Sequence, residues 1–94
     1  MADQGEIFIG NKPFMNYVTA AILQFHSGAK EVVVKARGRY ISKAVDVVEY
    51  IRSKVMPNLK VKDIQIGSEE FKAQDKEGKE RTRRVSWISI TIGQ

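Results

Sequence analysis

The chain has 94 residues, of which 43% are hydrophobic and 29% charged, a composition typical of a folded globular protein and not of a disordered one. It has no cysteine and one histidine, which excludes disulfides, thiolate catalysis and metal sites built on cysteine or on several histidines of one chain. No apolar stretch approaches the roughly 20 residues that span a bilayer, and the first residues do not resemble a signal peptide. We therefore expect one domain (1–94), cytoplasmic, without cofactor or metal. The net charge of +5 favours a polyanionic partner, either nucleic acid or an acidic membrane surface.

The first third of the chain predicts a strand, a helix and a second strand. Residues 6–10 form a short, largely apolar run that ends at a glycine. Pro13 suits the first turn of a helix, and from Met15 apolar residues recur at helical spacing as far as Gly28, which can end the helix. The nearly continuous valines of residues 31–36 predict a central strand.

A basic stretch, residues 35–43, follows this second strand and contains four cations and no acid. A strand that leads through a basic glycine turn into a helix start can hold phosphate oxygens on backbone N–H groups and arginine forks. A solvated loop that happens to be basic explains the same pattern equally well. The four cations are Lys35, Arg37, Arg39 and Lys43.

A second helix is predicted from residue 41 to residue 55, where Pro57 and Asn58 stop it. Its apolar residues recur at helical spacing and should form one buried face. These residues are Ile41, Ala44, Val45, Val48, Ile51 and Val55.

Alternating apolar residues predict two more strands, residues 59–74 and 82–92, with a bulge near Asp63 and a hairpin turn at 75–79. Residues 69–84 contain six cations, five acids and only one large hydrophobic residue, so they cannot pack against a core on both faces. They predict a two-stranded arm that projects from the body.

The resulting order is βαβαββ, an α/β chain folded as an α+β two-layer sandwich. The first two strands should be parallel with a right-handed crossover, and the final hairpin should join the sheet antiparallel. Two helices on one face of a four-stranded mixed sheet is the simplest closed arrangement.

No enzyme site is indicated. Gly38 stands alone without the glycine-rich loop of nucleotide-binding motifs, and Asp46 and Glu49 lie among cations on what should be a solvated helix face.

Three separated basic elements instead suggest binding to a polyanion: Lys12 before the first helix, the basic stretch, and the outgoing strand of the arm. In an extended strand Lys79, Arg81 and Arg83 would point to one side and could line a groove of DNA, with Arg84 beside them. An ordinary charged hairpin remains the alternative for the arm.

Several motifs resemble those of the Alba family of archaeal chromatin proteins. Residues 9–18 (IGNKPFMNYV) resemble the opening motif of the family, and residues 34–39 and 41–46 with Glu49 resemble its central motif almost residue for residue. Ile66-Gly67-Ser68 and the basic hairpin before Val85-Ser86 complete a pattern that covers roughly residues 7–92.

The resemblance implies a fold like the C-terminal domain of a bacterial translation initiation factor and a homodimer that coats double-stranded DNA with little sequence preference. The body would contact the backbone and the arm would enter the minor groove. The residues expected at the nucleic acid are Lys12, Asn16, Lys35, Arg37, Arg39, Tyr40 and Lys43 in the body, and Lys79, Arg81, Arg83 and Arg84 in the arm.

Two positions depart from the family pattern. Asn11 occupies the slot of the lysine whose acetylation tunes DNA affinity, so only Lys12 is left for modification and for a deacetylase to act on. Val55 and Met56 stand where some members carry a phenylalanine that packs dimers together along DNA, which puts cooperative filaments in question.

Three alternatives remain open on the sequence. RNA can replace DNA as the main ligand, because phosphate contacts are common to both. A paralogue can replace the second copy in the dimer. The basic surface can also meet an acidic protein in a larger complex.

Overall fold

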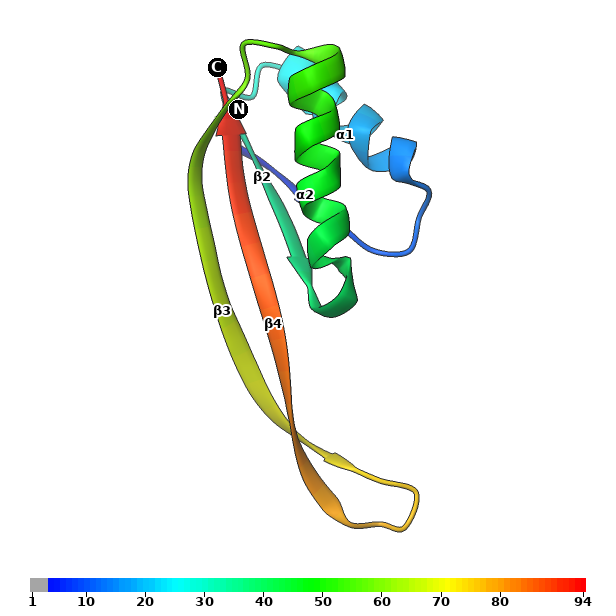
Figure 1. The fold of residues 1–94 in the computed structure, drawn as a ribbon. Coiled ribbons are helices and arrows are strands. Elements are labelled where there is room, and N and C mark those ends of the chain that lie inside the picture. The colour runs from blue at the N-terminus through cyan, green and yellow to red at the C-terminus, as the bar shows by residue number, and fades with distance from the viewer. Residues whose placement is uncertain (1–3) are drawn as a thin grey trace.

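A computed structural model describes residues 4–94, which form a four-stranded sheet with two helices on one face and a long hairpin arm (Figure 1). The predicted order βαβαββ is confirmed. In chain order the elements are β1 (Gln4–Phe8), α1 (Phe14–His26), β2 (Glu31–Arg37), a 3-10 turn η1 (Gly38–Tyr40), α2 (Ile41–Tyr50), a π-helical turn η2 (Ile51–Val55), β3 (Lys60–Gln74) and β4 (Glu80–Gly93).

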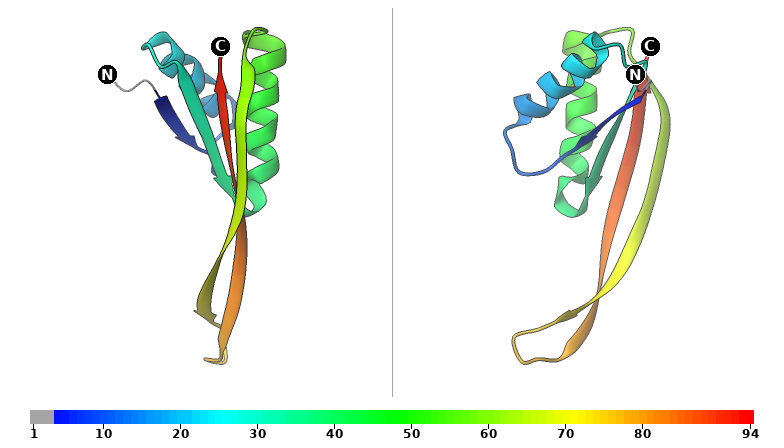
Figure 2. Two further views of the ribbon diagram at one scale, coloured as in Figure 1. Left: turned by 90° about the vertical axis from the view of Figure 1, so that its left-hand side faces the viewer. Right: turned by 180° about the vertical axis from the view of Figure 1, so that it is seen from behind.

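The strands lie in the order β1-β2-β4-β3, with β1 parallel to β2 and β4 antiparallel to both of its neighbours. The predicted bulge in β3 falls between Val61 and Asp63. Strand β2 ends at Arg37, opposite Trp87, whereas β3 and β4 stay paired beyond that point as far as the Gln74–Glu80 pair. The hairpin therefore extends past the body as the predicted arm, and the molecule measures 51 × 23 × 22 Å (Figure 2).

The core lies between the helices and the central strands β2 and β4. Alternate side chains of these strands meet the apolar stripes of α1 and α2, because successive strand residues point to opposite faces. An edge-to-face contact between the rings of Phe14 and Tyr50, with centroids 5.6 Å apart, joins the two helices. The fully buried side chains are Val18, Ala21, Val32, Val34, Ala44, Val47, Ile51 and Ile92.

The second helix differs from the predicted one in its apolar face. Val45 and Val55 are exposed, and Val47 is buried in their place. After Tyr50 the helix widens into η2, where the Met56 N–H donates to the Ile51 carbonyl at 2.7 Å. A wider turn changes the direction in which later side chains point, so the spacing that predicted a buried Val55 no longer holds.

Tyr17 and Lys43 fix the loop between β1 and α1. The Tyr17 hydroxyl accepts the backbone N–H groups of Gly10 and Lys12 at 2.8 and 3.0 Å. The Lys43 ammonium, from the first turn of α2, donates to the carbonyls of Gly10 and Lys12, both at 2.7 Å, and lies 5.1 Å from the centre of the Tyr17 ring. Lys43 therefore ties this loop to the start of α2.

Asp75 organises the tip of the arm. Its carboxylate accepts the backbone N–H groups of Glu77 and Lys79 at 2.9 Å and the Arg81 guanidinium at 3.0 Å. Gly78 supplies a positive φ of 81° in this turn, a conformation that other residues rarely adopt. The hydrogen bond from the Lys79 N–H, with smaller contributions from Glu77 and Arg81, lowers the pKa of the Asp75 carboxyl.

Replacing Lys43→Met should lower the free energy of unfolding by about 1–2 kcal/mol, because two carbonyls lose a charged donor while the aliphatic part of the side chain is kept. Chemical denaturation measures this change. The matched control is Lys54→Met, an exposed lysine in η2, which should have almost no effect. Equal effects of the two substitutions would contradict a tethering role for Lys43.

The turn at the arm tip should depend on the charge of Asp75. Because folding lowers the pKa of this carboxyl, its stabilising effect is complete above the pKa of an unfolded aspartate and is lost as the pH falls through the lower folded value. NMR titration should show the amide signals of Glu77 and Lys79 shifting together, at a pH below the midpoint of the same carboxyl in a short unstructured peptide. Coincident midpoints would contradict the assignment, and Asp75→Asn should abolish the transition.

Candidate nucleic-acid interface

The three predicted basic elements lie toward the same end of the molecule. The loop before α1 and the η1 turn stand at the end of the body from which the arm projects (Figure 1). The Lys43 ammonium touches the Lys12 carbonyl, so the first two elements are in direct contact. Glu69, at the root of the arm, lies 4.0 Å from Arg37 and connects the second element to the third.

The turn between β2 and α2 exposes two arginines. Gly38 begins η1 with a φ of 60°, in the left-handed region that favours glycine, and reverses the chain directly after the strand. Arg37 and Arg39 on either side of it are exposed. Arg39 donates to the Tyr40 hydroxyl at 2.8 Å and lies 5.0 Å from the centre of its ring, so Tyr40 orients this guanidinium.

The loop before α1 exposes Lys12 and Asn16, the latter in the first helical turn. Lys43 occupies a different position from these two residues. It is half-buried, and two of its three N–H donors are used on backbone carbonyls. The sequence showed Lys43 as one more cation of the basic stretch, but its contacts with Gly10 and Lys12 assign it to the support of the loop.

Four of the predicted cations carry an acidic partner. Ion pairs join Lys35 to Glu6 at 3.0 Å, Arg37 to Glu69 at 4.0 Å, Arg81 to Asp75 at 3.0 Å, and Arg84 to Glu70. Ion pairs between such exposed groups are weak, typically about 0–1 kcal/mol, so a phosphate can replace the carboxylate at little cost. The other predicted cations have no ion pair within residues 4–94; they are Lys12, Arg39, Lys43, Lys79 and Arg83.

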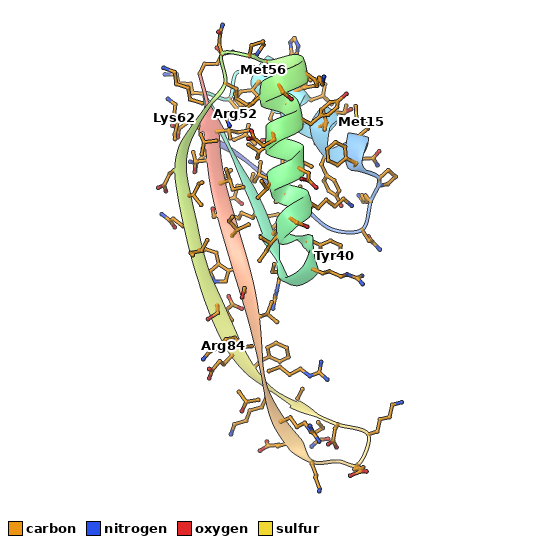
Figure 3. The ribbon with its side chains drawn as sticks, viewed as in Figure 1. Met15, Tyr40, Arg52, Met56, Lys62 and Arg84 are labelled. Atoms are coloured by element: carbon orange, nitrogen blue, oxygen red, sulfur yellow. The ribbon has the colours of Figure 1, made fainter. Side chains whose placement is uncertain are left out.

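The arm presents arginines on both of its faces. Arg81 and Arg83 alternate along β4 on one side, and Arg84, which pairs with Glu70 across the ladder, lies on the other (Figure 3). Lys79 was predicted to continue the row of Arg81 and Arg83. It lies instead in the turn before β4, where Asp75 accepts its N–H, so strand alternation does not apply to it.

The face of the sheet that the helices leave uncovered carries a feature that we did not predict. Trp87 lies there across Gly67 of the neighbouring strand, and a Cβ on Gly67 would stand 2.5 Å from the indole. Phe8 on β1 is 68% exposed, and the hollow on this face, of about 460 Å³, is lined by both rings. The sequence contained a signal for this position. Ile88, Ile90 and Ile92 pack toward the helices, and because neighbouring strand residues point to opposite faces, Trp87 must lie on the uncovered face.

The edge strand β3 carries a second unpredicted feature. Ile64 and Ile66 alternate on the helix-facing side, opposite Ile90 and Ile88 of β4, yet they are 55% and 76% exposed. Val45 on α2 is exposed as well. Apolar residues gathered on one flank are typical of a protein contact.

Two further kinds of site are absent from the part of the chain that the structure describes. Residues 4–94 contain no group of three or more histidine, aspartate or glutamate side chains placed to hold a metal ion. Within the same residues no helix is long and apolar enough to cross a membrane.

Comparison with known proteins places this architecture in a family. The model of the Alba family matches residues 5–68. The chain is 46% identical over 91 residues to DNA/RNA-binding protein Alba 1 of Archaeoglobus fulgidus, covering 97% of both chains, and 48% identical over the full length of both chains to DNA/RNA-binding protein Alba of Methanothrix thermoacetophila. Among solved structures it resembles Alba from Thermoplasma volcanium, with a TM-score of 0.82, 42% identity and coverage of 96% and 100%. It also resembles ALBA1 from Trypanosoma brucei, with a TM-score of 0.74, 26% identity and coverage of 96% and 68%. The chain belongs to the Alba family.

Proposed function

We propose that this protein binds double-stranded DNA as a dimer, without sequence preference, and coats and compacts the chromosome in the cytoplasm. The observation that carries the proposal is the gathering of two basic loops and a basic arm at one end of a small body. Similar chains named DNA/RNA-binding proteins support binding to nucleic acid and a role other than catalysis.

The proposed contacts divide between body and arm. In the body, Lys12, Asn16, Arg37, Arg39 and Tyr40 meet the phosphate backbone, where the starts of both helices add backbone N–H groups and partial positive charge. Lys35 is available once a phosphate replaces Glu6, while Lys43 mainly holds the loop that presents Lys12.

The arm supplies the second set of contacts. Its two strands form a twisted ribbon whose arginines reach the minor groove or the phosphates that border it, and Lys79 extends this charge to the tip. The arm residues are Lys79, Arg81, Arg83 and Arg84. None of them is placed on a helix that could read base edges in the major groove, which favours binding without sequence preference.

The proposed dimer uses the apolar flank of Ile64, Ile66 and Val45. Covering these side chains would stabilise the dimer by about 25 cal/mol for each Å² of apolar surface that is removed from water. The second protomer is another copy of this chain, and a paralogue with a matching flank is the alternative.

With Val55 and Met56 in place of an aromatic residue, we expect only weak association of dimers along DNA. Lys12 is the candidate for acetylation beside Asn11, with a deacetylase as the partner that reverses it.

RNA is the second candidate for the main ligand, and the names of the relatives favour neither nucleic acid over the other. Competition between duplex DNA and structured RNA of equal length at fixed salt separates the two. The further alternative, a structural subunit on an acidic protein, requires a complex that survives nuclease treatment.

Affinity for duplex DNA should depend steeply on salt. A dimer that neutralises about 6–10 phosphates loses about 10³–10⁵ in affinity between about 50 and 200 mM salt, because bound counterions are released. Fluorescence anisotropy of labelled duplexes measures this slope. An affinity that hardly changes with salt would refute the proposal.

The substitution Arg39→Ala should weaken binding to all duplex sequences alike and lower the salt slope by about one for each phosphate that is no longer neutralised. The same anisotropy titrations, repeated on several unrelated sequences, measure both effects. Lys30→Ala, an exposed lysine in the connection between α1 and β2 at the opposite end of the body, serves as the control and should change neither quantity. A selective loss on one sequence would contradict binding without sequence preference.

Placing a charge on the apolar flank should prevent dimerisation. In Ile66→Asp a carboxylate would lie in the interface without a partner, which is strongly unfavourable, and because Ile66 is exposed in the protomer the fold itself should survive. Analytical ultracentrifugation should find a monomer. Leu23→Asp, at another exposed position, on α1, is the matched control and should remain dimeric. A dimer in both variants would place the interface elsewhere.

A further inference from the structure

The hollow on the uncovered face of the sheet has the chemistry of a nucleobase site. Its walls combine two aromatic rings, two cations and three side chains that can form hydrogen bonds. The face of the sheet that carries them is turned toward the viewer in the left view of Figure 2. Side chains at these positions point away from the helices, because they alternate with the core-facing residues of the same strands. The residues that carry the argument are Phe8, Lys35, Arg37, Gln65, Glu69 and Trp87.

The Trp87 ring is held in place before any ligand arrives. The indole occupies the space above Gly67, where a side chain would collide with three of its ring atoms at 2.5–3.0 Å. Trp87 is partly exposed, so part of the ring remains free to contact a ligand in the hollow. A ring fixed in this way loses little side-chain freedom on binding, which favours stacking.

Phe8 is the most exposed aromatic side chain on this face, at 68%. The Lys35 ammonium lies 5.6 Å from the centre of its ring and forms an ion pair with Glu6. Phe8 therefore combines an open aromatic surface with an adjacent cation, and base–aromatic stacking in single-strand binding sites uses the same combination.

The polar groups around the rings suit a base and its phosphate. Gln65 can donate and accept hydrogen bonds, and Glu69 can accept from an N–H of the base, such as the N3–H of uracil or thymine. Arg37, 4.0 Å from Glu69, can turn toward a phosphate next to the bound base. A paired base cannot enter, because its faces are covered by its neighbours in the duplex and its edge by its partner.

We infer that this hollow binds one unpaired nucleobase of a single-stranded RNA or DNA segment, against the Trp87 and Phe8 rings, with Arg37 at the adjoining phosphate. The inference rests on the proposed function and adds to it a second mode of binding, on a different face from the dimer flank. A protein with both modes would hold duplexes through its loops and arm, and exposed single strands through the sheet.

Trp87 is the only tryptophan of the chain, so the tryptophan fluorescence comes from the hollow. Oligo-U, oligo-dT and a mixed-sequence duplex of equal length are titrated into the full-length protein at low salt. Anisotropy of the labelled nucleic acid is followed in parallel and detects binding at any site. We expect Trp87 quenching with the single strands and almost none with the duplex, and the ratio of oligo-U to oligo-dT affinity tells RNA from DNA as the source.

Substitution of Phe8→Ala should weaken single-strand binding about 5- to 100-fold, as expected when a stacking ring is removed, and leave duplex affinity within about twofold. Leu23→Ala, which removes an exposed apolar side chain from α1, is the control and should alter neither affinity. Circular dichroism verifies that both variants fold.

The outcomes separate the two proposals. Equal quenching by duplex and single strands would overturn the inference, as would single-strand binding that leaves Trp87 fluorescence unchanged or that resists Phe8→Ala. If anisotropy shows no binding of duplex DNA at all, the proposed function fails, whereas Trp87 quenching by single strands would still support the hollow.

Discussion

The antiparallel pairing of β3 with β4 is the constraint on which the rest of the structure depends. Near the Lys60–Gly93 end of the ladder, the two strands complete the sheet on which both helices pack. Beyond Trp87 no third strand and no helix of the described residues accompany them, and a two-stranded ribbon alone is marginal in water. The arm is therefore held by its root in the core and by the Asp75 turn. Because an apolar side chain in the arm would find nothing to pack on, its sequence is free to consist mostly of charged residues.

Topology explains why the two basic loops meet. Strands β1 and β2 are parallel and adjacent, so their carboxyl ends lie at the same edge of the sheet, and each leads into the start of a helix. Lys12 follows the first strand and Arg37 ends the second. The Lys43 ammonium then spans the remaining gap through the carbonyls of Gly10 and Lys12. The parallel arrangement of β1 and β2 therefore brings these charges together, and Lys43 ties the two loops to each other.

The sequence predicted what local patterns determine. Alternation predicted the two long strands and the bulge near Asp63, helical spacing predicted α1 and most of α2, and the absence of apolar residues predicted the arm. The motifs resembling the Alba family were confirmed by the comparisons. The expectation for Val55 was wrong because a π-helical turn changes the helical phase, and no local pattern in the sequence predicted that turn.

Contacts between residues distant in the chain, such as those of Lys43 with Gly10 and of Trp87 with Gly67, depend on sheet register and helix packing. The candidate residues could thus be proposed from the sequence as a set, whereas the contacts that set Lys43 apart from its exposed neighbours could not be predicted.

The carboxylates within the candidate interface have a consequence for the mode of binding. Glu69 and Glu70 hold Arg37 and Arg84 near the root of the arm through ion pairs that are exposed and hence weak. A guanidinium held in this way is extended toward solvent, and it can exchange a carboxylate for a phosphate without losing a strong partner. Such an exchange depends only on the charge and spacing of the phosphates, and these are nearly the same in a duplex of any sequence. The acidic residues of the arm lower its positive charge, but they are compatible with reversible binding to a polyanion that does not depend on base sequence.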